Sequence, residues 1–239
     1  MRLAQVLFSQ GFGTRRECDN LILAGEVRLH GEVVDDPAHE VDPHGLVFNV
    51  EGKDWPFHEK AYVLMHKPAG HECSHRPSAW PSIYTLLPSP LRLRDVQAVG
   101  RLDQDTTGLL ILTDDGALIH RLTSPKKHVP KVYEVGTAQP VTEGQVAQLL
   151  AGVVLHDDPK PVSAAACEIV GERQLRLTLT QGKYHQVKRM VAAAGNEVLS
   201  LHRSRFGALV LPDDLAPGQW RWLAGPQDIL GSGGAAPAR

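Results

Sequence analysis

The sequence contains few cysteines, few aromatic residues and no long apolar run. Its three cysteines, Cys18, Cys73 and Cys167, lie far apart among 239 residues and form no CxxC pair. This spacing argues against a disulfide framework and against a cysteine-rich zinc site. No apolar run approaches the roughly 20 residues that span a bilayer, and residues 3–8 are too short and too interrupted for a secretory core. These absences predict a cytoplasmic protein without a membrane segment.

The sequence also lacks an overall positive charge. Its formal net charge is −2, although a protein that binds nucleic acid needs positive charge where phosphates approach. Two local runs are nevertheless basic, because residues 120–131 contain no acid and residues 183–205 contain one, Glu197. Each run is compatible with a solvated surface or with an RNA-binding groove. A hydrophobic content of 42% supports a substantial core in one large or two small domains.

The most informative carboxylate is Asp103, in a polar loop that runs into the apolar segment Leu109–Leu112. Such a loop can present an oxygen nucleophile, or it can shape a polar turn. It also partly matches a helix-loop-helix calcium site, with Asp103 and Asp105 at ligand positions. That site should end in a bidentate Glu and be followed by a helix, whereas an apolar strand follows here. From the residues alone the three interpretations remain open.

A second place where metal ligands gather is His71, Cys73 and His75. A structural zinc site needs a second ligand pair at suitable spacing, and none follows these residues. We therefore expect no metal, and the sequence contains no cofactor-binding motif.

The N-terminal part predicts two short helices and a hairpin. Apolar residues at helical spacing predict a helix within residues 3–11. Thr14 and Glu17 form a capping box that opens a second helix. Residues 27–34 indicate a hairpin that turns at His30–Gly31.

The rest of the chain predicts a larger domain at residues 61–230, after a first domain at 1–50 and a linker at 51–60. Strands and helices mix there without regular βαβ alternation, which favours an α+β domain with a largely antiparallel sheet. The expected strands are residues 62–65, 109–112, 132–137 and 175–179, and the expected helices are 117–122, 142–150 and 184–194. The Gly- and Ala-rich tail at 231–239 is expected to be disordered.

Four motifs occur in an order that resembles a known family. Gly100–Gly108 is similar to the GRLDxDTxG motif of pseudouridine synthases that modify ribosomal RNA. Lys67–Ser74 resembles their KPxGxxCS segment, Lys131–Tyr133 their KxY element, and Gly182–Met190 their closing motif. Residues 1–34 resemble the small RNA-binding module called the S4 domain. The resemblance implies an S4-type domain followed by a catalytic domain with a mixed, largely antiparallel sheet flanked by helices.

The resemblance also implies roles for individual residues. It makes Asp103 the nucleophile, and it makes Lys188 the basic residue that contacts this carboxylate. Tyr133 has the character to stack on the uracil near C5, where a proton must leave. The residues expected to bind the substrate are Arg101, Leu179, Arg189, Lys126, Lys127, Arg15 and Arg16.

The motifs are most similar to the branch that acts on the small ribosomal subunit. This implies isomerisation of a uridine of 16S ribosomal RNA, by resemblance uridine-516, free or in a partly assembled subunit. The reaction needs no redox step, so no cofactor is expected, and neither a membrane nor an obligatory protein partner is evident. Two alternatives stay open: a paralogue that modifies 23S ribosomal RNA, and a ribosome-binding factor with an S4 domain that binds without reacting.

Overall fold

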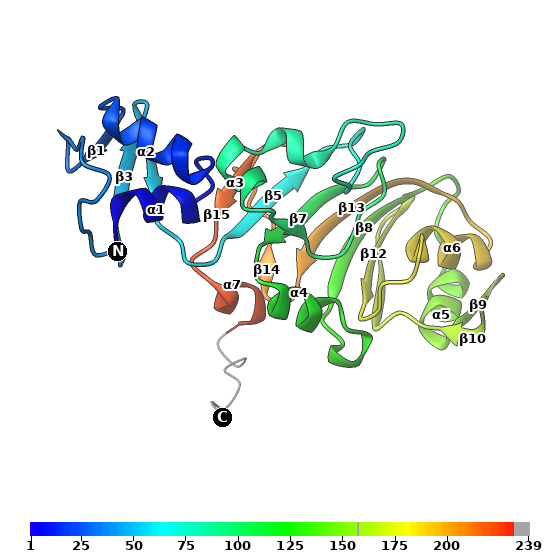
Figure 1. Cartoon of the computed structure of the whole chain (residues 1–239). Coiled ribbons are helices and arrows are strands. Elements are labelled where there is room, and N and C mark those ends of the chain that lie inside the picture. Colours follow the sequence, from blue (N-terminus) through cyan, green and yellow to red (C-terminus); the bar gives the residue numbers. More distant parts are fainter. Residues whose placement is uncertain (157, 232–239) are drawn as a thin grey trace. The chain divides into compact units, whose positions relative to one another are not determined.

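The computed structural model describes residues 1–156 and 158–231 and divides the chain into two compact units. The first unit contains Met1–Ala61 together with Leu87–Gln97. The second contains Tyr62–Leu86 and the described residues from Ala98 onward (Figure 1). Of the tail expected at 231–239, all but the first residue lies outside the described residues.

The first unit combines short helices with a four-stranded antiparallel sheet in the order β2-β1-β3-β4. Its elements are α1 (Leu3–Ser9), α2 (Arg15–Leu23), β1 (Val27–Leu29), β2 (Glu32–Val33), β3 (Val47–Val50), β4 (Lys53–Pro56) and α3 (Ser89–Leu93). The predicted capping box is present, since Glu17 N donates to Thr14 Oγ1 and Thr14 N donates to the Glu17 carboxylate. The predicted turn is also confirmed, because His30 and Gly31 both have positive φ angles, as a tight two-residue hairpin turn requires.

The expected linker at residues 51–60 is partly a strand. β4 lies within it and pairs with β3. Lysine, aspartate and proline favour a loop interpretation, but Trp55 of β4 is buried and its ring lies edge-on to Phe12. Burial of this large side chain accounts for a strand in a segment with loop-like composition.

A later segment of the chain packs into the first unit through Gln10. The Gln10 side chain is 1% exposed, and its Oε1 accepts from His58 N at 3.1 Å and from Arg94 Nη1 at 2.9 Å. The carbonyl oxygen of Pro90 lies where a Cβ on Gly11 would be. These contacts hold α3 in this unit, although Tyr62–Leu86 of the second unit precedes it in the chain.

The second unit is built on one mixed sheet of nine strands, with the main path β11-β12-β8-β13-β7-β5-β15. The strands are β5 (Tyr62–Lys67), β6 (Gln97–Ala98), β7 (Thr107–Thr113), β8 (Lys131–Thr137), β11 (Ala166–Gly171), β12 (Gln174–Leu179), β13 (Val198–Phe206), β14 (Leu209–Val210) and β15 (Trp220–Trp222). On the main path, β13 and β7 pair in parallel and every other pair is antiparallel. The expectation of a mixed, largely antiparallel sheet is confirmed.

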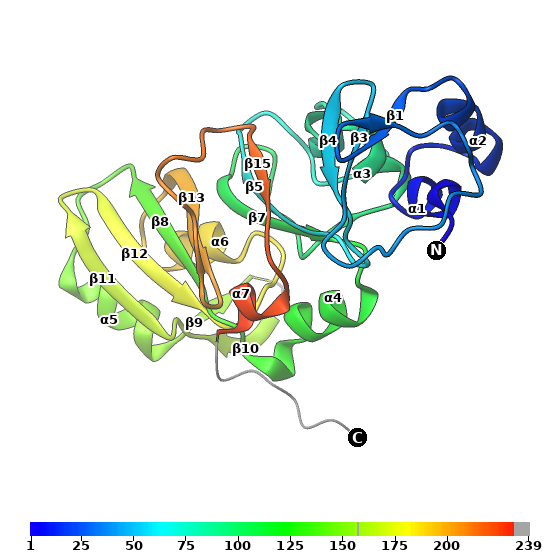
Figure 2. The same cartoon turned by 90° about the vertical axis from the view of Figure 1, so that its left-hand side faces the viewer.

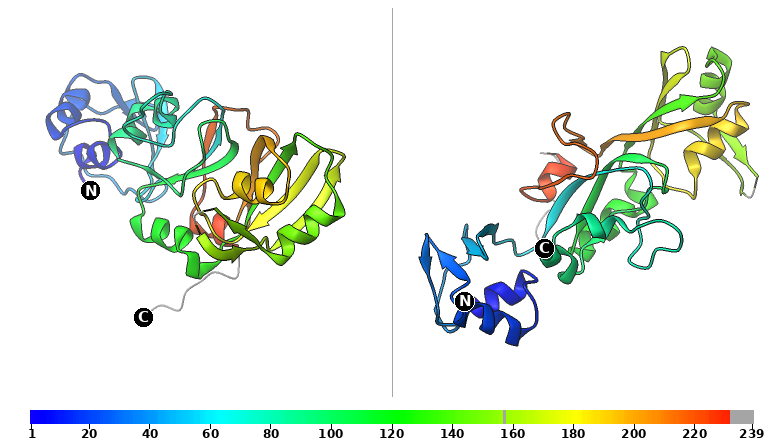
Figure 3. Two further views of the ribbon diagram at one scale, coloured as in Figure 1. Left: turned by 90° about the vertical axis from the view of Figure 1, so that its right-hand side faces the viewer. Right: turned by 90° about the horizontal axis from the view of Figure 1, so that it is seen from above.

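Helices and two shorter strands complete this unit. They are η1 (Ile83–Leu86), α4 (Gly116–Thr123), η2 (Pro125–Lys127), α5 (Glu143–Ala151), β9 (Val153–Leu155), β10 (Asp158–Val162), α6 (Gln186–Ala193) and α7 (Pro226–Leu230). The opposite views in Figures 2 and 3 show α5 and α6 on one face of β8, β11 and β12. Val187, Met190 and Val191 of α6 join the core there at the predicted helical spacing.

β7 and β13 approach each other most closely at Gly108. This glycine has φ +110° and pairs with Arg203. A Cβ built on Gly108 would lie 2.3 Å from the carbonyl oxygen and 2.7 Å from the nitrogen of Arg203. Only glycine fits, because both the space and the φ angle exclude a side chain.

We predict that Gly108→Ala lowers the free energy of unfolding by about 3 kcal/mol or more, since it adds an overpacked backbone contact to an unfavourable φ. Chemical denaturation monitored by circular dichroism measures the change. Gly116→Ala is the matched control, because Gly116 begins α4 with no atom within 4 Å of a built Cβ and no positive φ. The free energy of unfolding of this control should be unchanged or up to about 1 kcal/mol higher. Equal effects of the two substitutions would contradict the account.

Candidate active site

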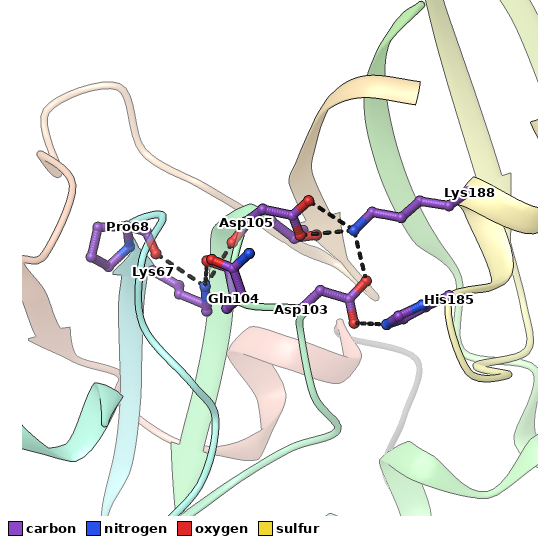
Figure 4. Close-up of polar contacts among 8 residues, drawn as sticks. Lys67, Pro68, Asp103, Gln104, Asp105, His185 and Lys188 are labelled. Atoms are coloured by element: carbon purple, nitrogen blue, oxygen red, sulfur yellow. Dashed lines mark hydrogen bonds and ion pairs between the residues drawn. The ribbon is translucent and has the colours of Figure 1, made fainter. Parts of the chain in front are cut away.

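The loop that carries Asp103 is held by the buried side chain of Lys67, at the end of β5. Lys67 is 0% exposed, and its Nζ donates to the carbonyl oxygens of Pro68 at 3.0 Å, Gln104 at 3.2 Å and Thr106 at 2.8 Å. Burial lowers the pKa of Lys67, while electrostatic interactions with Cys73, Asp105 and Asp103 oppose that shift. The bonds to Gln104 and Thr106 fix the backbone on both sides of Asp105, and Figure 4 shows Lys67 reaching toward this loop.

Asp103 lies between two basic side chains from the start of α6. One carboxylate oxygen, Oδ1, is 3.1 Å from His185 Nε2, and the other, Oδ2, is 3.2 Å from Lys188 Nζ. Figure 4 shows both side chains pointing at the carboxylate. The Asp103 side chain is 28% exposed, so it is oriented by partners and still accessible from solvent.

Lys188 also binds Asp105, with Nζ 2.8 Å from Oδ1 and 2.9 Å from Oδ2. Burial acts to lower the pKa of Lys188, but the hydrogen bond to Asp105 and the charge of Asp103 outweigh it and raise the pKa. For Asp105, burial acts to raise the pKa, and the hydrogen bond and charge of Lys188 outweigh it and lower the pKa. Lys188 is therefore held as a cation between two carboxylates.

The contact between Lys188 and Asp103 matches the expectation, whereas the roles of His185 and Asp105 were not foreseen. All four residues lie inside the matched motifs, but a motif does not say which of its members touch. His185 has φ 48° and directly precedes α6. Its ring stacks on Tyr184, with the ring centroids 3.8 Å apart. This left-handed turn starts the helix and directs the imidazole to Asp103.

A cavity of about 150 Å³ opens beside Asp103. Lys188, Tyr133, Leu179 and Arg101 all line it, so the structure brings these predicted residues together. Tyr133 comes from β8 and Leu179 from the neighbouring β12. The cavity is lined by apolar side chains, one carboxylate and several basic side chains.

The remaining predicted substrate-binding residues lie elsewhere. Lys126 and Lys127 are exposed on η2, and Arg15 and Arg16 are exposed at the start of α2 in the first unit. The Arg15 guanidinium lies 4.9 Å from the centre of the Phe8 ring. Arg189 is partly buried, and its Nη1 donates to the carbonyl oxygen of Tyr184 at 3.1 Å. This bond ties Arg189 to the turn before α6.

The geometry does not support the calcium site considered at Asp103 and Asp105 or the zinc site considered at His71, Cys73 and His75. Within residues 1–156 and 158–231, no three His, Cys, Asp or Glu side chains gather as a metal site. The loop after Asp103 continues into β7, and both of its carboxylates contact Lys188. Cys18, Cys73 and Cys167 are all free thiols.

The comparisons with known proteins agree with this geometry. The family model described as RNA pseudouridylate synthase matches residues 61–193, and the S4 domain model matches residues 1–47.

The chain belongs to the RNA pseudouridylate synthase family. A curated relative, ribosomal small subunit pseudouridine synthase A of Vibrio cholerae, is 39% identical over 223 residues, which cover 93% of this chain and 96% of the relative. The protein of the same name in Escherichia coli is 38% identical with the same coverage. A crystal structure of a pseudouridylate synthase matches with a TM-score of 0.66 and 37% identity, covering 93% of this chain and 96% of the other.

This pseudouridylate synthase therefore has an N-terminal S4 domain and a catalytic domain, and it is an RNA pseudouridine synthase. Among the described residues, no helix is long and apolar enough to cross a membrane.

We predict that Lys67→Met reduces kcat for pseudouridine formation about 100-fold with a smaller change in KM, because the loop that carries Asp103 loses its hydrogen bonds from Lys67 to Gln104 and Thr106 and moves. Steady-state kinetics measure the effect. Lys60→Met serves as the control for protein stability, since Lys60 is exposed and its substitution should change the unfolding free energy by less than about 0.5 kcal/mol. Full activity of Lys67→Met would refute the positioning role of this lysine.

Proposed function

We propose that this protein isomerises one uridine of 16S ribosomal RNA, uridine-516, to pseudouridine, with Asp103 as the nucleophile. The observation that carries the proposal is the placement of Asp103 at the cavity, with each of its carboxylate oxygens next to a basic side chain. The names of the relatives in Vibrio cholerae and Escherichia coli support the small ribosomal subunit as the source of the substrate.

The reaction breaks the bond between C1′ and N1, turns the uracil and joins C5 to C1′. The Asp103 carboxylate either bonds to C1′ or takes a proton from C2′, which gives a glycal. His185 and Lys188 orient the carboxylate for either route, because they contact its two oxygens separately. Composition does not change between substrate and product, so the proposed route uses no cofactor.

The target base must leave its stack to reach Asp103, since the reacting atoms are covered within RNA. Tyr133 stacks on the flipped uracil and Leu179 packs against it, because both line the cavity beside the carboxylate. Arg101 is exposed at the same cavity, where it contacts a phosphate next to the target nucleotide or holds the space that the base has left.

The substrate is recognised along a longer stretch of RNA than the cavity covers. Arg15 and Arg16 are exposed in the S4 domain, and Lys126 and Lys127 are exposed in the catalytic domain. Arg189 adds a further cation beside the turn before α6. Contacts of this kind bind phosphates without reading sequence and set position and affinity. The proposed partner is 16S ribosomal RNA or a partly assembled small subunit, and the proposed location is the cytoplasm.

We expect the intact protein to release tritium from C5-labelled uridine in 16S RNA, free or with small-subunit proteins bound. Asp103→Asn should reduce the rate at least about 1,000-fold, because the amide keeps the shape and loses the nucleophile. Gel-shift binding of the same RNA by the variant controls for folding and substrate recognition.

Tritium release from 23S RNA instead would favour the paralogue that modifies the large subunit. Binding without release from any ribosomal RNA would refute the enzymatic assignment and favour the S4-bearing ribosome-binding factor.

The S4 arginines give a separate expectation. Replacing Arg15 and Arg16 together by Ala should weaken binding of 16S RNA and make its dependence on salt shallower, by about one unit of slope for each phosphate that the protein no longer neutralises. The test is Kd measured at salt concentrations between about 50 and 200 mM KCl. An unchanged salt slope would exclude these two residues from phosphate binding.

A further inference from the structure

Two cations flank Tyr133 in the cavity, on the side of the sheet that faces Asp103. Lys131 precedes Tyr133 by two residues on β8, so both side chains point to the same face. Arg203 of β13 is the register partner of Tyr133. All three residues line the cavity.

A β-bulge brings a third residue to this face. The register between β13 and β8 shifts between Arg203 and Arg205, and Phe206 pairs with Lys131. The extra residue lets both Arg203 and Phe206 face the cavity, which a regular strand with its period of two would not allow. The Phe206 ring centre lies 5.2 Å from Lys131 Nζ and 5.2 Å from Arg203 Cζ. The bulge therefore places the two cations around one ring.

Arg203 is buried with part of its hydrogen-bonding capacity unused. The residue is 2% exposed, and its Nε donates to the carbonyl oxygen of Leu109 at 2.8 Å. Its Nη2 is buried and has no hydrogen-bond partner among the described residues. Burying a charged N–H group without an acceptor is costly, and the cost at Nη2 indicates a group that is bound during function.

Lys131 is the second cation of the pair, and it is partly buried. Its Nζ donates to the carbonyl oxygen of Val129 at 3.0 Å. Burial, and then the charge of Arg203, lower the pKa of Lys131 to about 8. The cavity contains a single carboxylate among its described lining residues, Asp103, and His185 and Lys188 already contact it.

Other charged groups surround the pair without neutralising it. Glu134 follows Tyr133 on β8, and its carboxylate is bound by Arg176 of the neighbouring strand β12 at 2.9 Å. The further basic side chains that line the cavity are Arg101, Lys183, His185 and Lys188. The space beside Tyr133 is therefore positively charged and suits a ligand with negative charge.

We propose that Lys131 and Arg203 stabilise the uracil anion that forms when the bond between N1 and C1′ breaks. This inference rests on the proposed function and assigns the two residues a catalytic role in it. The bond breaks while C1′ gains an oxygen of Asp103, or while C2′ gives its proton to that carboxylate. In both routes the electron pair leaves with the uracil and is shared by N1 and the two carbonyl oxygens.

Charge and atoms balance over the whole step. Lys131 and Arg203 keep their protons and supply only positive charge. When C5 bonds to C1′, the Asp103 carboxylate is released or returns its proton to C2′. The base is then neutral, and the loss of one proton from C5 with the gain of one at N1 restores its conjugated ring without changing its charge. Donors aimed at a charge that develops during reaction lower the barrier more than they strengthen ground-state binding.

The position of the pair favours the base over a backbone phosphate as its ligand. Arg203 is almost fully buried and lies beside Tyr133, which is proposed to stack on the uracil. Phosphates stay at the mouth of the cavity, where the exposed Arg101 can reach them. The two possibilities differ in what they change: a contact to the anion alters the rate of the chemical step, and a contact to a phosphate alters RNA affinity and its salt dependence.

The test compares Lys131→Met with Lys131→Arg, which keeps the charge. Single-turnover rates with excess enzyme, RNA Kd and the salt slope of Kd are measured with 16S RNA. We expect Lys131→Met to slow the chemical step about 100-fold, with Kd changed less than about threefold and an unchanged salt slope. Lys131→Arg should recover at least about tenfold of the lost rate.

Three results would overturn the proposal: an unchanged single-turnover rate in Lys131→Met, a salt slope shallower by about one unit, or an Arg variant as slow as the Met variant. Release of tritium by the intact protein is established first. Its absence would refute the proposed function itself, whereas activity that is insensitive to Lys131 refutes only this role.

A pH profile provides an independent readout. Lys131 loses its charge as the pH rises through its pKa of about 8, so kcat/KM of the intact protein should fall about tenfold more between about pH 7 and 9 than that of Lys131→Arg, which stays charged. Identical profiles would contradict the assignment.

Arg203→Lys should slow the chemical step with little change in Kd. Because the substitution also removes the hydrogen bond to Leu109, thermal unfolding of the variant controls for a loss of stability.

Discussion

The arrangement of the active site depends on the close approach of β7 and β13 at Gly108. The backbones of the two strands lie so near each other that a Cβ at position 108 would collide with the backbone of Arg203. β7 continues from the loop that carries Asp103, and β13 carries Arg203. β13 also pairs with β8, which carries Tyr133. One short parallel pairing thus places a carboxylate, an aromatic ring and a buried cation at a single cavity.

Charge is distributed unequally across that cavity. On one side, Lys188 binds two carboxylates and its pKa is raised, so it stays charged and holds Asp103 in position. On the other side, Lys131 and Arg203 lie close together without a carboxylate, and the pKa of Lys131 is lowered. Lys188 has its carboxylate partners before the substrate binds. In the proposed reaction, Lys131 and Arg203 gain a negatively charged partner only when the uracil leaves as an anion. Preorganised charge of this kind is a large source of rate enhancement in enzymes.

Much of the fold could be predicted from local patterns, because capping boxes and apolar strands are decided by neighbouring residues. The capping box predicted at Thr14 is present, and β7 and β12 extend the predicted strands by at most two residues at either end. β13 could not be predicted in this way, since it is rich in polar residues and its one buried cation, Arg203, is covered by partners distant in sequence. The contact of His185 with Asp103 is likewise invisible in sequence, because it joins residues that are far apart in the chain. Family resemblance supplied the proposed role of Asp103, and the structure shows which side chains contact it.

The central claim is that Asp103 acts on a uridine of the small-subunit RNA. The most direct measurement maps pseudouridine along all ribosomal RNA of an Escherichia coli strain that lacks its own small subunit pseudouridine synthase A and expresses this protein. The account predicts that pseudouridine forms at uridine-516 of 16S RNA in cells that express the intact protein and does not form there with Asp103→Asn. Modification restored equally by both forms, or found only in 23S RNA, would contradict it.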